Sequence, residues 1–223
     1  GAALAGVTLW VSSSLRMLLE SAQAVIDASD EGADAAGDAL LALVGRDTEE
    51  LTPGQIRSAA IESLAENLSD GLVAPLSAFL ILSFVSVPSA AAGAAFVKAV
   101  NTMDSMYGYP GPFGWGSARL DDFVMFVPAR ASAALLALAA GDPDAPLRAR
   151  RYARKLASPN AGWPMGTLAA ALDLRLEKPG VYVLNDVAAG PTERDGYAAI
   201  ALTKRAGGIA YLLAAIAGVF RWL

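Results

Sequence analysis

Long uncharged stretches alternate with short charged blocks along this chain. Residues 71–97 carry no charged side chain, and residues 206–220 form a second uncharged run that is flanked by Lys204, Arg205 and Arg221. A helix needs about 20 predominantly apolar residues to cross a bilayer, and basic residues typically anchor its ends. Residues 1–26 also place apolar side chains at helical spacing. The pattern predicts a helical membrane protein.

Prolines interrupt this pattern and predict broken helices. Pro75 suits a first helical turn, whereas Pro88 is expected to break the helix that contains it. The 15 residues from 73 to 87 therefore form either a short or re-entrant helix or part of a crossing. The apolar run 131–141 is too short to cross alone, and residues 123–127 extend it.

Local signals place several elements. Thr52, Pro53 and Gln55 form a capping box with proline at the first helical position, which predicts a helix from Pro53 to about Asp70. The remaining expectations are an alanine-rich helix in 27–45, a helix over 167–176, and a loop over 178–195 with a strand fragment at 182–184.

Composition agrees with a membrane protein and excludes several chemistries. The 223 residues are 55% hydrophobic and 17% charged, below the roughly 25% of a soluble domain. Cysteine and histidine are absent. Disulfides, Cys/His zinc sites, cysteine nucleophiles and histidine triads are therefore excluded, and Asp, Glu, Lys or Tyr must carry any acid–base chemistry.

The balance of charged residues bears on the possible partners and on the orientation in the membrane. Seventeen basic residues oppose 22 acidic ones, giving a net charge of −5, which disfavours a nucleic-acid partner. The basic segment 147–156 is expected on the cytoplasmic side of a cell membrane. We expect one all-α, multi-pass membrane domain over residues 1–223, with short or broken transmembrane helices and motif loops at the cytoplasmic face.

The first candidate site lies on the helix that begins at Pro53. Glu62, Glu66 and Asp70 are spaced by four residues and share one helix face, beside Asn67. Such a face is often simply solvated. Alternatively it binds Mg²⁺ or a substrate amine, since hard cations prefer oxygen ligands. The uncharged run after Asp70 favours the second interpretation, because charge at a membrane boundary is costly.

A second polar face follows the uncharged run. Lys98, Asn101, Asp104 and Ser105 can share one side of a helix. Lys98 alternatively snorkels to the membrane interface, with no role in a site.

Two further groups follow. The first group consists of Arg119, Asp121, Asp122 and Arg130. Arg119 and Asp122 can form a local ion pair. Arg130 lies between apolar runs, where its charge needs an anionic partner. Residues 158–164 form a rigid loop in which Ser158, Asn160 and Trp163 either bind a ligand or only shape a turn. No Walker-type phosphate loop or dinucleotide fingerprint is present in the sequence.

Six motifs in order resemble the adenosylcobinamide-phosphate synthase family of cobalamin biosynthesis. They are Val44-Gly45-Arg46-Asp47-Thr48, Glu62-Ser63-Leu64-Ala65-Glu66-Asn67-Leu68-Ser69-Asp70-Gly71, Lys98-Ala99-Val100-Asn101-Thr102-Met103-Asp104-Ser105-Met106, Ala118-Arg119-Leu120-Asp121-Asp122, Pro128-Ala129-Arg130 and Ser158-Pro159-Asn160-Ala161-Gly162-Trp163-Pro164. They define a motif core over residues 44–165. The family has a further apolar N-terminal region that we expect to be missing here, and its histidine before Ser-Pro-Asn is replaced by Leu156-Ala157.

The resemblance implies an integral membrane ligase. Such an enzyme joins a carboxylate of adenosylcobyric acid to the amine of an aminoalkyl phosphate of the aminopropanol phosphate type, giving adenosylcobinamide phosphate. Activation of the carboxylate implies ATP and Mg²⁺. The corrinoid is then substrate rather than cofactor, and other membrane enzymes of the corrinoid pathway are expected partners. A non-catalytic sensory relative of the same fold, or a transporter, remains the alternative.

On this interpretation each polar residue receives an expected role. The catalytic set is Glu62, Glu66, Asp70, Asp104 and Asp122. The Mg²⁺ ligands are Glu66, Asp70 and Asp104. The substrate- and phosphate-binding set is Arg46, Asp47, Asn67, Lys98, Asn101, Ser105, Arg119, Asp121, Arg130, Ser158, Asn160 and Trp163.

Overall fold

The computed structural model describes residues 1–32, 35–36, 40, 51–108, 111, 113–153 and 156–222, and these are almost entirely helical. The elements are α1 (Ala2–Ser12), α2 (Leu15–Asp27), the 3-10 helix η1 (Ser29–Glu31), α4 (Pro53–Leu68), the π-helical turn η2 (Ser69–Val73), α5 (Ala74–Ser83), α6 (Val87–Tyr107), α7 (Trp115–Val124), α8 (Phe126–Ala140), α9 (Ala145–Ala153), α10 (Gly162–Ala171), β1 (Leu176–Lys178), β2 (Tyr182–Leu184) and α11 (Glu193–Trp222). The all-α prediction is confirmed, apart from the small antiparallel hairpin β1–β2.

Three helical stretches of the described chain are long and apolar enough to cross a membrane: Ala2–Glu31, Pro53–Ser83 and Glu193–Val219. A fourth becomes possible if α7 and α8, bent by 48° against each other, form one broken span. The prediction of a multi-pass protein with broken helices is therefore confirmed.

The stretch Pro53–Ser83 corrects one prediction. Its capping box is present, since the Thr52 hydroxyl accepts from the Gln55 N–H and the Gln55 side chain accepts from the Thr52 N–H. The helix does not end near Asp70, however, because it continues through η2 into α5. Because Pro75 lacks an N–H, it cannot donate the usual helical hydrogen bond to the carbonyl of Gly71, four residues earlier. The N–H of Ser14, between α1 and α2, donates to this carbonyl at 3.0 Å.

The break at Pro88 is confirmed. Helix α5 ends at Ser83, and α6 begins at Val87 with Ser86 as its cap, whose hydroxyl accepts from the Ser89 N–H at 3.1 Å. Pro88 therefore occupies a first helical turn, where its missing N–H leaves no hydrogen bond unmade.

The predicted boundaries after residue 160 are partly wrong. Helix α10 spans Gly162–Ala171, so it begins within the rigid loop predicted over 158–164 rather than at residue 167, and it ends before residue 176. Pro164 is tolerated because the N–H groups of a first helical turn have no partner within the helix. Asp173 turns the chain with φ of +53°, and Leu176 then enters β1. The strand at 182–184 is confirmed as β2, whereas β1 was not predicted. The helix expected over 27–45 lies largely outside the described residues, and Ser29–Glu31 forms a single 3-10 turn.

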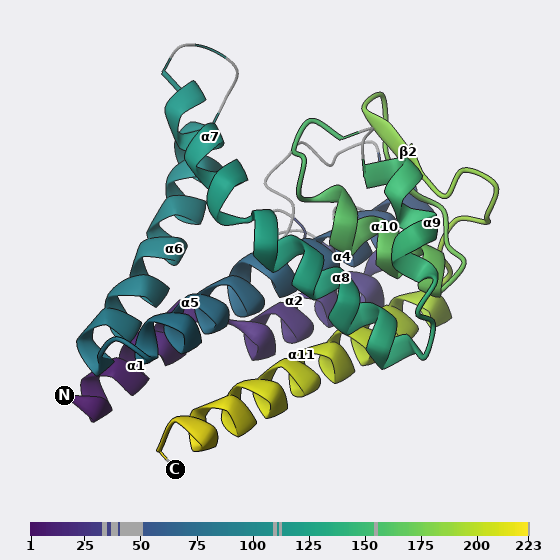
Figure 1. Ribbon diagram of the computed structural model, residues 1–223. Coiled ribbons are helices and arrows are strands. Elements are labelled where there is room, and N and C mark those ends of the chain that lie inside the picture. Colours follow the sequence, from purple (N-terminus) through teal and green to yellow (C-terminus); the bar gives the residue numbers. More distant parts are fainter. Residues whose placement is uncertain are drawn as a thin grey trace.

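Several helices with exposed apolar side chains extend toward one end of the molecule. In Figure 1, α1, α5 and the second half of α11 extend toward the end where both termini lie, whereas α9, α10 and the hairpin lie at the other end. Large hydrophobic side chains are exposed on the elements of the first end, which suits contact with lipid. They include Leu4, Val7, Trp10, Val11, Ile81, Phe84, Phe96, Leu212, Leu213, Ile216 and Val219.

Candidate functional site

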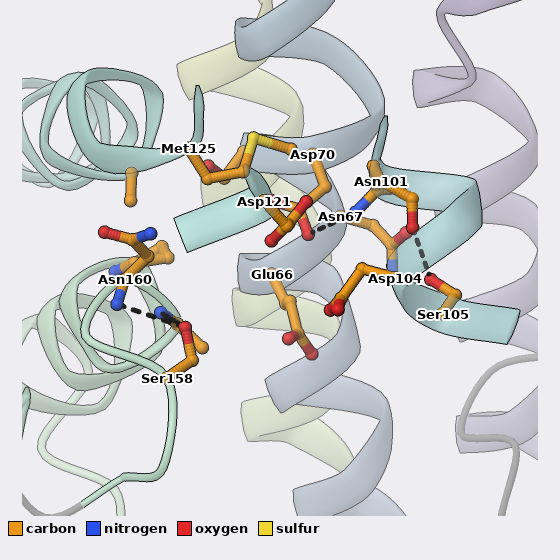
Figure 2. A pocket seen from close by; sticks show the side chains of 14 residues that line it. Glu66, Asn67, Asp70, Asn101, Asp104, Ser105, Asp121, Met125, Ser158 and Asn160 are labelled. Atoms are coloured by element: carbon orange, nitrogen blue, oxygen red, sulfur yellow. Dashed lines mark hydrogen bonds between the residues drawn. The ribbon is translucent and has the colours of Figure 1, made fainter. Parts of the chain in front are cut away.

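A polar cavity of about 440 Å³ lies where η2 meets α6, α7, α8 and the loop before α10. We call it the acidic pocket, because four of its side chains are Glu66, Asp70, Asp104 and Asp121. Its other lining residues are Asn67, Ser69, Asn101, Ser105, Met125, Ala129, Ser158, Asn160, Ala161 and Pro164. Figure 2 shows the carboxylates facing one space, with Asn160 and Ser158 across from them.

The α4–η2 wall contributes Glu66 and Asp70. Four residues separate them, so they lie on one helix face. Asp70 accepts a hydrogen bond from the Asn101 Nδ2 at 3.1 Å, which ties this wall to α6. Asn67 instead donates to the Ser63 carbonyl and hydroxyl, at 3.1 and 3.0 Å, along its own helix.

Helix α6 contributes Asp104. Its Oδ1 is buried and has no hydrogen-bond partner among the described residues. The atom lies so close to Gly108 that a Cβ there would come within 2.1 Å of it, so the position requires glycine. Burial raises the pKa of Asp104 above its ordinary value, and the nearby negative charge of Asp122 raises it further.

Helix α7 contributes Asp121. Its Oδ1 is likewise buried without a hydrogen-bond partner in the described part of the chain. Its carboxylate is close enough to those of Asp104 and Glu66 to be repelled by both. Carboxylates gathered in this way favour a positively charged ligand with N–H donors, which would satisfy the unpartnered oxygens.

The expected Mg²⁺ ligands do not form a ready-made ion cage. No group of three acidic side chains in the described residues is close enough to hold one metal ion, so Glu66, Asp70 and Asp104 do not meet the condition for a closed site. Mg²⁺ is usually held by one or two carboxylates together with substrate phosphates. The set of Mg²⁺ ligands therefore stays a prediction.

A second cavity, of about 610 Å³, lies beside the first between α8, α9 and the loop before α10. We call it the basic pocket, because Arg130 and Arg150 line it together with Trp163. Its other lining residues are Pro146, Leu147, Ala153, Leu156, Ala157 and Pro159. The guanidinium of Arg130 lies over Phe126, 3.5 Å from the ring centroid, and 5.2 Å from the Trp163 ring centroid.

Asn160 connects the two pockets. It lines the acidic pocket and is only 4% exposed. Its Oδ1 accepts from the Arg130 Nη1 at 3.0 Å, and its Nδ2 donates to the Asp122 carbonyl at 2.8 Å. Asn160 thus lines one pocket and accepts a hydrogen bond from an arginine that lines the other.

The family model described as CobD/Cbib protein matches residues 1–210 of the chain. The chain belongs to this family. It is 40% identical over 209 residues to a probable cobalamin biosynthesis protein CobD of Methanothrix thermoacetophila, covering 91% of this chain and 66% of that protein. It is 38% identical over 225 residues to the cobalamin biosynthesis protein CobD of Rhodobacter capsulatus, covering 92% and 68%. The chain thus spans about two thirds of the length of these relatives. No solved structure matches it.

Several predicted CobD/Cbib site residues lie in the acidic pocket, and others do not. Glu66, Asn67, Asp70, Asn101, Asp104, Ser105, Asp121, Ser158 and Asn160 line it, whereas Arg130 and Trp163 line the basic pocket. Asp122 contributes its carbonyl to Asn160, and its carboxylate pairs with the exposed Arg119 at 3.2 Å. Lys98 lies on another side of α6, in a groove against α1. Arg46 and Asp47 fall outside the described residues.

Glu62 has a different environment from the other predicted catalytic residues. It is 5% exposed, and its carboxylate accepts from the Tyr182 hydroxyl at 2.7 Å and from the Ser58 hydroxyl at 2.9 Å. The Ser58 hydroxyl also accepts from the Glu177 N–H at 2.7 Å. These bonds attach the hairpin to α4, so the arrangement points to a structural role for Glu62.

Sequence reasoning missed two residues near the pockets. Arg150 was assigned only to a basic segment, yet it faces the same cavity as Arg130. Lys178, at the end of β1, lies near enough to Glu66 to attract its charge. No short-range signal marks either residue, because each reaches its position through contacts between distant segments.

Proposed function

We propose that this protein forms the amide bond between a carboxylate of adenosylcobyric acid and the amine of an aminoalkyl phosphate, giving adenosylcobinamide phosphate. The observation that carries the proposal is the acidic pocket, in which Asp104 and Asp121 each keep a buried carboxylate oxygen without a described partner. An alkylammonium group supplies both the positive charge and the N–H donors that these oxygens lack.

The chemistry requires an amine that has lost its proton. A carboxylate first binds the ammonium ion and then accepts a proton, so that the nitrogen lone pair can attack the acyl carbon. Asp104 suits this task, because its raised pKa makes it a stronger base than an ordinary aspartate. The remaining carboxylates keep the amine in place and lower the cost of bringing it to the acyl carbon.

The acyl carbon also needs a leaving group. Transfer of the γ-phosphoryl group of ATP to the corrinoid carboxylate releases ADP and gives an acyl phosphate. Attack by the amine then forms the C–N bond, releases inorganic phosphate and leaves the amine proton on the carboxylate. The proposed reaction therefore consumes ATP, which binds as its Mg²⁺ complex.

The corrinoid must be recognised through its periphery. The sequence has no histidine that could ligate the cobalt. The amide and carboxylate groups at the corrin edge remain for recognition, and the basic helix α9 contributes residues to the lining of the basic pocket. By the positive-inside rule we propose that this end faces the cytoplasm, where other membrane enzymes of the pathway could exchange corrinoids with it.

A product assay tests the proposal. Membranes containing the protein are incubated with adenosylcobyric acid, aminopropanol phosphate and Mg-ATP. The corrinoids are then separated, and their masses are determined by mass spectrometry. We expect the mass of the amide, which should be missing from membranes without the protein and greatly reduced without ATP. Failure to form amide under any of these conditions would favour a sensory relative or a transporter.

A further inference from the structure

We infer that the basic pocket is the subsite for the phosphate group of the amine substrate, and that Arg150 is a binding residue for that phosphate. The inference rests on the proposed function, since it assigns one end of the same substrate. It adds a residue that lies outside the family motifs and a reason why the substrate is a phosphate ester rather than a free amino alcohol.

The two pockets together match a short zwitterion. The acidic pocket suits an ammonium group, and the basic pocket presents two guanidinium groups that suit a phosphate dianion. Asn160 lines the first pocket and accepts from an arginine of the second. A substrate whose ammonium and phosphate groups are joined by a short carbon chain would place one charged end in each pocket.

The two arginines of the basic pocket differ from two nearby arginines in their partners. Arg119 pairs with Asp122, and Arg148 pairs with Asp142. No ion pair within the described residues involves Arg130 or Arg150. Arg151 is also without an ion pair in the described part of the chain, but it lies over the Tyr152 ring and does not line the basic pocket. Arg130 and Arg150 therefore present charge in the cavity that no described carboxylate neutralises.

The surroundings of Arg130 preorganise it for phosphate. Its Nη1 donates to the Phe126 carbonyl at 2.6 Å and to Asn160, while Phe126 and Trp163 border its planar face. A guanidinium has five N–H donors, so donors remain for phosphate oxygens in the bidentate geometry that arginine favours.

The phosphates of ATP are a second possible source of the same chemistry, and kinetics separates the two. We expect Arg150→Gln to raise the KM for aminopropanol phosphate about tenfold or more, because a hydrogen-bonded charge is lost. The KM for ATP should stay near wild type, and so should turnover of unphosphorylated aminopropanol at saturating concentration. Arg151→Gln, at the adjacent position of α9, is the matched control and should change none of these values.

Other outcomes overturn the inference. A raised KM for ATP with an unchanged KM for the aminoalkyl phosphate would make the pocket a nucleotide site. Equal KM values in Arg150→Gln and Arg151→Gln would remove Arg150 from substrate binding.

A binding measurement separates this inference from the proposed function. Titration of the purified protein with aminopropanol phosphate needs no turnover. If the wild type binds it and Arg150→Gln binds it at least about tenfold more weakly, the subsite stands even where no amide forms. If amide forms but both proteins bind the compound equally, the subsite fails while the proposed function stands.

Discussion

The side chain of Asn160 holds the guanidinium of Arg130 through a 3.0 Å hydrogen bond from Nη1 to Oδ1. Because Asn160 also donates to the Asp122 carbonyl, it fixes the basic pocket relative to the end of α7. The acidic and basic pockets are therefore connected through a single buried amide, and we propose that they act as one site.

Substitution of Asn160 tests this coupling. Asn160→Asp keeps the shape but replaces the Nδ2 donor with an anionic oxygen that faces a carbonyl and neutralises Arg130. We expect the KM for aminopropanol phosphate to rise about tenfold or more, with a smaller rise in Asn160→Ala, which adds no charge. Steady-state kinetics in membranes provides the measurement. Wild-type KM values in both variants would disconnect the two pockets.

Asp104 is expected to set the acid limb of the pH profile. Its carboxyl is held above its ordinary pKa by burial and by Asp122, so the base form is lost as pH falls through this raised value. The rate should therefore decline at a higher pH than an ordinary aspartate would give. The profile of kcat/KM reports the free enzyme, so a profile that stays flat down to the ordinary aspartate range would exclude Asp104 as the base.

The same residue is expected to lower stability at neutral pH. A raised pKa in the folded state means that folding disfavours the ionised form, so stability falls as pH rises through that pKa. Asp104→Asn should thus raise Tm at neutral pH, and should leave it unchanged at pH values below the ordinary aspartate pKa. Thermal unfolding in detergent at several pH values measures this. A lower Tm for the variant at neutral pH would contradict the burial of an unsatisfied charge.

Gly162 is expected to set the spacing of α9 and α10. A Cβ at this position would lie 2.5 Å from the Ala153 Cα, which is backbone and cannot rotate away. Gly162→Ala should cost about 1–3 kcal/mol of unfolding free energy by overpacking. Gly208→Ala is the control, since a Cβ there meets nothing within 4 Å. Equal stability of both variants would show that α9 and α10 separate easily.

Glu62 is expected to support the fold rather than the reaction. Tyr182→Phe removes the hydroxyl that donates to Glu62 and leaves a buried carboxylate oxygen with one partner fewer. We expect a loss of about 1–3 kcal/mol in stability, with kcat within a few-fold of wild type. Tyr211→Phe, at an exposed position of α11, is the control. If Tyr182→Phe left Tm unchanged but lowered kcat strongly, the result would support a catalytic role for Glu62 instead.

The periodicity of the sequence was sufficient to bring part of the acidic pocket together. Glu66 and Asp70 share a face of one helix, and Asn101 and Asp104 share a face of another, because spacings of three or four residues place side chains side by side. Lys98 lies six residues before Asp104, which rotates it by about 120° around the helix. That rotation explains why it points into the groove against α1 instead.

Other features depend on contacts that spacing does not encode. Glu62 has the same four-residue spacing as Glu66 and Asp70, but Tyr182, 120 positions away, binds its carboxylate. Within the π-helical turn Ser69–Val73, the Gly71 carbonyl accepts a hydrogen bond from the N–H of Ser14, 57 positions earlier in the chain. Arg150 joins Arg130 only because α9 folds back on α10. Partners that are distant in the chain decided each of these outcomes.

The most direct test of the account is amide formation by Asp121→Asn and Asp104→Asn in membranes. Asparagine preserves the shape of each side chain but removes the charge that binds the ammonium group. Mass-spectrometric assay of the amide from adenosylcobyric acid and aminopropanol phosphate should show a fall of about 100-fold or more in each variant, while both remain folded and still bind the corrinoid. Wild-type rates in both variants would show that the reaction takes place outside the acidic pocket.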